Sequence, residues 1–132
     1  MQTNHKPRAL RNLVDEFERG IIALPLMQRD YVWRAKRVVA LLDSLYKGYP
    51  IGCFYLWSSQ KQQRKKGVGN VTPGYYLLDG QQRLTSLQAA KASDGQPGTA
   101  YFDVENECFY LAEQSRRISG RIEENDPTLV AL

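Results

Sequence analysis

The hydrophobic positions of the first 50 residues recur at the spacing of two amphipathic helices. The first set predicts a helix near residues 8–19, and Gly20 is placed to take the left-handed conformation that ends many helices. The second set predicts a helix over residues 35–47, which Gly48 and Pro50 would end. The residues that carry the pattern are Leu10, Leu13, Val14 and Phe17 in the first helix, and Val38, Leu41, Leu42 and Leu45 in the second.

Apolar runs without helical spacing predict short strands. Residues 21–26 predict a short strand or arm, because Pro25 keeps Leu24 out of helical geometry. Residues 51–57, rich in aromatic side chains, are the best strand candidate. Further strands are predicted over residues 75–78, 100–104 and 107–111, the last two as a hairpin that turns at Glu105 and Asn106.

The segments between these elements are polar and predict loops. Residues 27–34 mix charges with aromatics and predict a structured loop, whereas residues 58–74 predict a mobile basic loop. We expect residues 1–112 to form one compact α/β (α+β) domain, in which a small mixed sheet is flanked by helices. Residues 113–132 then start a C-terminal helical or linker region, which we expect to be truncated.

Positive charge is concentrated in the first part of the chain, which has 132 residues and a net charge of +4. Residues 1–74 carry 13 Lys and Arg against 5 Asp and Glu, and residues 75–132 carry 5 against 9. Such an excess favours a polyanionic partner, either a nucleotide or a nucleic acid. A solvated basic face is the alternative that needs no partner.

Cysteine and histidine are too few for several kinds of active site. Cys53 and Cys108 lie in apolar runs, where we expect both to be buried, as in a reducing compartment. A zinc site or a His-Asn-His nuclease would need more such residues than the chain has, and a Ser/His/Asp triad would have only His5 available. No run of about 18 apolar residues is present. We therefore expect a cytoplasmic protein without membrane contact.

The most polar short connection in the chain is Asp79-Gly80-Gln81-Gln82-Arg83, between a predicted strand and a helix predicted over residues 84–92. A turn from a strand into a helix presents unpaired N–H groups and the positive end of the helix dipole. Both attract phosphate. The connection is therefore a candidate phosphate site.

Each side chain of this motif suits such a site. Gly80 would let a ligand approach the backbone, and Arg83 could fork onto phosphate oxygens. Asp79 could hold a metal ion or orient a water molecule, and Gln81 or Gln82 could orient the same water. A carboxylate beside phosphate is repulsive unless a cation lies between them, so we expect Mg²⁺ with a nucleoside triphosphate. The structural alternative is a capping box formed by Asp79 and Gln82.

A second polar cluster precedes the second helix and could join the same site. Arg29, next to Gln28, could add another fork to the phosphates, and Tyr31 or Trp33 could stack on a base or a guanidinium. Core packing is the alternative for Trp33. Thr85 could supply a hydroxyl to phosphate or metal, although a solvated or back-bonded hydroxyl is the commoner outcome.

The basic loop gives a weaker signal for nucleic acid. Its cations could follow a nucleic-acid backbone, but short basic loops also occur on proteins of many other functions. No Walker A sequence is present, which disfavours a P-loop fold. The cations concerned are Lys61, Arg64, Lys65 and Lys66.

Three motifs in fixed order together resemble the GmrSD N-terminal-domain family, which belongs to the ParB/sulfiredoxin-like superfamily. The motifs are residues 24–33, residues 41–52 and residues 77–85, and the resemblance covers about residues 8–112. Met27 departs from the family pattern, which usually has an aromatic residue there.

The resemblance implies a compact ParB/sulfiredoxin-like domain that binds and often hydrolyses a nucleoside triphosphate in modification-dependent restriction and other anti-phage systems. It also implies that residues 79–83 are the phosphate site and that residues 28–33 carry the Gln-Arg-x-Tyr-x-Trp element. Family members usually continue into a helical region and often a nuclease domain. We therefore expect a C-terminal domain or partner subunit, and no DNA cleavage by this chain alone.

Two hypotheses follow. The first is a regulatory domain of a DNA-targeting defence protein that binds and hydrolyses a nucleoside triphosphate, with Mg²⁺ at Asp79. The second is a non-catalytic nucleic-acid-binding or nucleotide-switch module, in which a ligand shifts a conformational population. Replacement of Asp79 by Ala should abolish Mg²⁺-dependent phosphate release only under the first.

Overall fold

The computed structural model describes residues 4–58, 73–91, 98–112 and 118–132. Its helices are α1 (Leu10–Glu18), α2 (Ala35–Tyr46), α3 (Gln81–Ala90) and α4 (Ser119–Glu123). Its strands are β1 (Ile22–Ala23), β2 (Tyr55–Ser58), β3 (Tyr75–Asp79), β4 (Ala100–Asp103), β5 (Cys108–Leu111) and β6 (Leu129–Ala131). The predicted fold class, a compact α+β domain, is confirmed.

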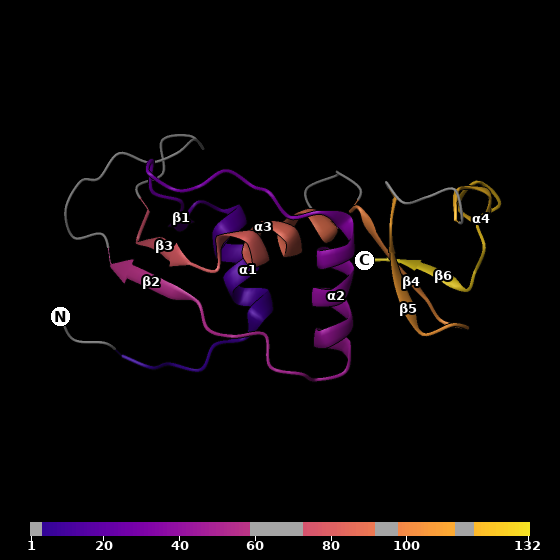
Figure 1. Ribbon diagram of the computed structural model, residues 1–132, viewed down its shortest axis with the longest axis horizontal. Coiled ribbons are helices and arrows are strands. Elements are labelled where there is room, and N and C mark those ends of the chain that lie inside the picture. Colours follow the sequence, from indigo (N-terminus) through magenta and orange to yellow (C-terminus); the bar gives the residue numbers. More distant parts are fainter. Residues whose placement is uncertain (1–3, 59–72, 92–97, 113–117) are drawn as a thin grey trace.

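The strands form two small sheets. In the first, with strand order β1-β3-β2, β1 is parallel to β3 and β2 is antiparallel to it. The second, with order β5-β4-β6, is antiparallel throughout. Figure 1 shows helices α1, α2 and α3 between the two sheets. The small mixed sheet that the sequence predicted is the first one, and its central strand leads directly into the polar motif.

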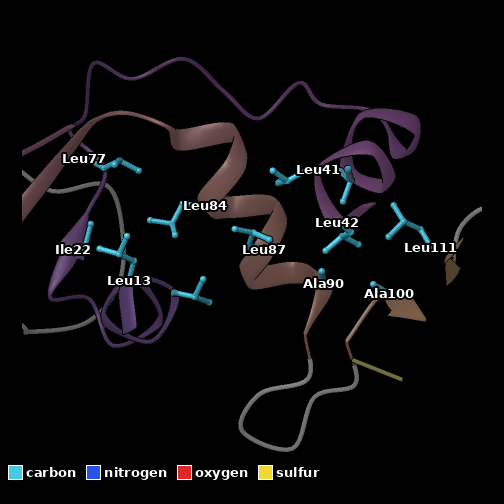
Figure 2. Packing of buried hydrophobic residues seen from close by; sticks show 12 residues of the cluster. Leu13, Ile22, Leu41, Leu42, Leu77, Leu84, Leu87, Ala90, Ala100 and Leu111 are labelled. Atoms are coloured by element: carbon cyan, nitrogen blue, oxygen red, sulfur yellow. The ribbon is translucent and has the colours of Figure 1, made fainter. Parts of the chain in front are cut away.

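One hydrophobic core joins both sheets through the helices. Figure 2 shows it as a continuous band that runs from Ile22 and Leu77 through Leu84 and Leu87 of α3 to Leu111 of β5. None of these five side chains is more than 7% exposed. Burial along α3 thus fixes this helix, and with it the position of its polar first turn.

The first two helices end where their glycines predict. Gly20 and Gly48 both take the left-handed conformation, with φ of 76° and 72°. The N–H group of Ile21 donates to the carbonyl of Glu16 at 2.9 Å, and so satisfies a carbonyl that the helix end leaves open. Within the described ranges, no helix is both long and apolar enough to span a membrane.

The strand prediction for residues 51–57 is wrong in its first half. Residues 51–54 have no regular secondary structure, because the carbonyl groups of Ile51 and Cys53 accept hydrogen bonds from a guanidinium instead of a neighbouring strand. Gly52 permits this path with a φ of 93°. The prediction that Cys53 is buried is also wrong, since this residue is exposed. Cys108 is partly buried.

The last residues of the chain form a strand that the hydrophobic pattern did not indicate. β6 pairs with β4, with Leu129 opposite Asp103 and Val130 opposite Phe102. The hairpin of β4 and β5, predicted from the sequence, is confirmed. The division of the chain at residue 112 stays a prediction.

An ionic cluster fixes this C-terminal part to the hairpin. The guanidinium of Arg121 contacts Asp103, which is 0% exposed, and Asp126, each at 2.6 Å. Hydrogen bonds from Arg121, and next from Asn106, hold the pKa of Asp103 well below its usual range. Those from Arg121 and Thr128 lower the pKa of Asp126 to about 2. The two carboxylates in turn raise the pKa of Arg121.

Candidate functional site

The polar motif forms the connection from β3 into α3. β3 ends at Asp79, Gly80 takes a φ of 99°, and α3 begins at Gln81, earlier than the predicted start at residue 84. Asp79 Oδ1 accepts a hydrogen bond from the N–H group of Gly80 at 2.9 Å. Gly80 is the N-cap, and α3 has no side-chain cap. The alternative of a capping box between Asp79 and Gln82 is therefore wrong, and the first-turn N–H groups have no capping side chain.

Arg83 turns back from α3 onto the segment before β2. Its Nη1 donates to the carbonyl of Ile51 and its Nη2 to that of Cys53, both at 2.7 Å. The guanidinium carbon lies 4.7 Å from the centroid of the Phe54 ring, within cation–π distance. Gly52 leaves room for this, because a Cβ there would lie 2.8 Å from Nη1. In this structure, the fork predicted for phosphate thus holds two backbone carbonyls.

Gly80 faces the Phe54 ring. A Cβ at residue 80 would lie 2.5 Å from Cδ1 of Phe54 and 3.3 Å from Nη2 of Arg83. Both this close packing and the left-handed backbone require glycine. The residue therefore has a structural role that needs no ligand.

Gln81 and Gln82 bind the loop that precedes α2. The side-chain amide of Gln81 donates to the carbonyl of Arg29. Gln82 Oε1 accepts from the N–H group of Val32 at 2.8 Å, and its Nε2 donates to the carbonyl of Asp30 at 3.1 Å. A loop without regular secondary structure is thereby fixed to the first turn of α3.

Two side chains of the same loop reach back to β3 and α3. Gln28 Nε2 donates to the carbonyl of Leu77 at 3.3 Å. The hydroxyl of Tyr31 lies 2.8 Å from Ser86 Oγ and donates to it, because the single hydroxyl hydrogen of Ser86 goes to the carbonyl of Gln82. The two predicted polar clusters are therefore adjacent, as a common site requires.

Trp33 supports the loop from inside. It is partly buried and packs against the hydrophobic core, which is the alternative considered for it from the sequence. The guanidinium carbon of Arg37 lies 5.5 Å from the centroid of its ring. The sequence did not single out Arg37.

Arg29 and Asp79 expose opposite charges beside the junction. Within the described ranges, the carboxylate of Asp79 accepts only from Gly80, and the Arg29 side chain forms no hydrogen bond or ion pair. Thr85 differs, because its Oγ1 is shielded from solvent and lacks a hydrogen-bond partner in the described part of the chain. Beside the junction, these three groups have bonding capacity that no described residue uses.

The predicted Mg²⁺ site and the predicted nucleic-acid contacts stay predictions. No group of three His, Cys, Asp or Glu side chains that could hold a metal ion occurs among the described residues. A single exposed carboxylate, Asp79, offers part of a Mg²⁺ site, which in nucleotide complexes includes phosphate oxygens. The cations of the basic loop lie outside the described residues: Lys61, Arg64, Lys65 and Lys66.

Sequence reasoning missed the part that residues 51–54 play. Gly52 and Phe54 shape the space around Arg83, yet both lie in a segment interpreted as a plain strand. A signal was present, because a glycine inside a strand pattern often marks the close approach of another group to the backbone.

The fold and the junction define a small α+β domain whose central strand leads, through a turn rich in glutamine and arginine, into a helix that binds two loops. The model of the family described as GmrSD restriction endonuclease, N-terminal domain, matches residues 10–129. The chain belongs to this family, which confirms the resemblance found in its sequence.

A curated relative extends well beyond the matched region. An uncharacterized protein of Methanocaldococcus jannaschii is 29% identical to the chain over 154 residues, which include 96% of the chain but 27% of the relative. The chain thus spans 27% of the length of the curated relative that it matches.

Proposed function

We propose that the chain is a regulatory domain that binds and hydrolyses a nucleoside triphosphate within a cytoplasmic, DNA-targeting restriction or anti-phage protein. The family description, the N-terminal domain of a restriction endonuclease, supports the wider role. The observation that carries the binding site is the uncapped first turn of α3 with the exposed Arg29 bound beside it. Free N–H groups and a guanidinium in this arrangement favour a phosphate chain.

The polar residues then fall into two groups. Arg29 and the first-turn N–H groups of α3 neutralise phosphate charge, which is the largest contribution in phosphoryl transfer. Asp79 orients the attacking water or binds the cation. Gln81, Gln82 and Arg83 are positioning residues, because they hold the backbone segments around the site.

The loop also supplies a surface for the base. Tyr31 is 43% exposed and offers a stacking face, while Trp33 supports the loop from the core side. Gln28 joins the loop to β3. The unused hydroxyl of Thr85 is shielded from solvent, so it could donate to the phosphates only after a movement of the turn.

Asp79 fits a role in Mg²⁺ binding. In nucleotide sites, Mg²⁺ is held by one or two carboxylates together with phosphate oxygens. The exposed carboxylate of Asp79 next to the turn has this chemistry. When bound, the ion would supply positive charge to the phosphate oxygens.

Titration of each nucleoside triphosphate with and without Mg²⁺, with phosphate release measured in the same samples, tests the proposal. Arg29→Gln should weaken binding about tenfold or more, since a hydrogen bond to a charged group contributes roughly 1.5–3 kcal/mol. Asp79→Ala should abolish Mg²⁺-dependent release.

The matched control is Arg19→Gln, which removes the same charge from an exposed ion pair with Asp15 on α1. This variant should bind nucleotide like the wild type. Equal losses in the two arginine variants, or no nucleotide binding by the folded protein, would refute the proposal.

A nucleotide switch without turnover is the second candidate. It is favoured by the bonding of the motif, because Gln82 and Arg83 tie one helical turn to two separate loops, and a phosphate that moved the turn would move both. Nucleotide binding without phosphate release, accompanied by altered hydrogen exchange in residues 29–33 and 51–54, would support it. A C-terminal nuclease or helical domain, or a partner subunit, would then receive the change.

A further inference from the structure

The start of α2 carries positive charge that the fold leaves unpaired. Arg34, Lys36 and Arg37 are all exposed, and no ion pair among the described residues includes them. We name these three residues the α2 basic surface. Five other cations of the described ranges pair with carboxylates, whereas Lys6, Arg11 and Arg29 have no ion pair there. The paired cations are Arg8, Arg19, Lys47, Lys91 and Arg121.

Helix stability does not account for the α2 basic surface. Arg34 is the N-cap of α2 but makes no side-chain cap hydrogen bond, and the first turn contains no acidic residue. Cations at this end of a helix oppose its dipole, so they destabilise the helix unless an anion lies nearby. An anionic partner would give these side chains a favourable role.

One side chain of the surface, Arg37, and the loop before it are held in place by contacts to their neighbours. Arg37 lies over the Trp33 ring at 5.5 Å from the centroid, and that ring packs against the core. The N–H group of Val32 is bound to Gln82 at 2.8 Å. A preorganised surface loses less conformational freedom on binding than a mobile one.

We propose that the α2 basic surface contacts the phosphate backbone of duplex DNA. Arg34 and Arg37 offer planar forks that match phosphate oxygens, and Lys36 adds a point charge. The choice of DNA rests on the proposed function, whereas the surface itself does not include the residues proposed to bind nucleotide.

Two other classes of partner fit the surface less well. A membrane interface would need a continuous apolar face turned outward beside the cations. The apolar face of α2 is buried in the core, and the exposed Tyr31 and Val32 precede the helix. Protein interfaces centre on apolar and aromatic side chains and, although enriched in arginine, are depleted in lysine. The nearest exposed apolar side chains, Tyr31 and Val32, belong to the preceding loop, so the cations of the helix start favour a regularly charged polymer.

Anisotropy of a fluorescent duplex of about 20 base pairs, measured between roughly 0.05 and 0.2 M salt, tests this assignment. The triple variant Arg34→Gln, Lys36→Gln, Arg37→Gln should bind roughly tenfold more weakly per lost contact near 0.1 M salt. The slope of log K against log salt should fall by about 0.9 for each contact. Circular dichroism of each variant establishes that it is folded.

The matched control is Lys6→Gln, Arg8→Gln, Arg11→Gln, which removes the same net charge near the N-terminus. Figure 1 shows the N-terminal segment along the lower side of the view and the segment that leads into α2 along the upper side. The control should keep the affinity and salt slope of the wild type.

Weaker duplex binding by the triple variant of Arg34, Lys36 and Arg37, with unchanged binding by the N-terminal control, supports the proposal. Equal weakening in both triple variants would show that only net charge matters, and would overturn it, as would absence of duplex binding by the wild type at low salt. Displacement of the duplex by polyglutamate at equal charge concentration, or binding to phosphatidylserine vesicles in place of DNA, would overturn it in favour of an acidic protein or a membrane. Nucleotide titration of the same samples keeps the two proposals distinct, because DNA binding without nucleotide binding refutes only the proposed function.

Discussion

The guanidinium carbon of Arg83 lies 4.7 Å from the centroid of the Phe54 ring, while its nitrogens donate to the carbonyls of Ile51 and Cys53. One side chain therefore joins the first turn of α3 to the segment before β2. Weaker nucleotide binding by an Arg83 variant could therefore result from a lost phosphate contact or from a displaced loop. The free energy of unfolding of the variant distinguishes these two causes.

Arg83→Ala should lower the free energy of unfolding by roughly 2–3 kcal/mol, because it removes two charge-assisted hydrogen bonds and a cation–π contact. Arg83→Lys should recover only a small part of this loss, since an ammonium group cannot fork onto two carbonyls. Urea unfolding followed by circular dichroism measures both variants. Unchanged stability in Arg83→Ala would contradict the positioning role and leave phosphate as the main partner of this side chain.

Gly80→Ala should destabilise the protein by about 2–5 kcal/mol, from a left-handed backbone (roughly 1–2 kcal/mol) and overpacking against Phe54 (about 1–3 kcal/mol). The matched variant is Gly48→Ala, because Gly48 also has a positive φ, 72°, but a Cβ there meets nothing within 4 Å. It should therefore lose only the backbone contribution. Equal losses of unfolding free energy would show that Phe54 does not press on residue 80.

Local signals explain why part of this architecture could be predicted from the sequence. The periodicity of α1 and α2 and the glycines that end them lie within a few residues of each other, and the structure confirms both helices. The polar motif was also identified locally, because residues 79–83 stand between an apolar strand and a helix. We also expected the cluster at residues 28–33 to join the same site, and the structure places it next to the motif.

The features that the sequence did not predict depend on contacts between positions far apart in the chain. Arg83 meets carbonyls 32 and 30 positions earlier in the chain, and no local pattern indicates such a pairing. The irregular path of residues 51–54 follows from that contact, and so does the exposure of Cys53. β6 was missed for the same reason, because its pairing with β4 joins Leu129 to Asp103.

Thr85→Val should raise the free energy of unfolding by about 1 kcal/mol, because a buried hydroxyl without a partner carries a desolvation cost of roughly 1–3 kcal/mol. Ser86→Ala is the control, since Ser86 Oγ donates to the carbonyl of Gln82 at 2.6 Å and lies next to Tyr31. That variant should lose about 1 kcal/mol. If both variants are destabilised equally in urea unfolding, Thr85 has a partner in the folded protein. In nucleotide titration, weaker binding by Thr85→Val alone would show that its hydroxyl contacts the phosphates.

The ionic cluster of the second sheet should make the protein sensitive to acid. In the folded state the pKa of Asp103 lies well below its usual range and that of Asp126 is about 2. Unfolded aspartates titrate near 3.9, so between about pH 4 and pH 2 the unfolded chain binds more protons than the folded one. The contribution of these carboxylates to the free energy of unfolding should therefore be complete above about pH 5. It should decrease as the pH is lowered from about 4 to 2.

Urea unfolding at a series of pH values measures this dependence, and the double variant Asp103→Asn, Asp126→Asn is the comparison. The variant should be less stable at neutral pH, because the guanidinium of Arg121 loses both charged partners, which lie at 2.6 Å. Its stability should then decline less between about pH 4 and pH 2, since two depressed carboxyl groups no longer titrate. Parallel curves for the two proteins would mean that other carboxylates cause the acid sensitivity, and that Arg121 does not depress these two pKa values in solution.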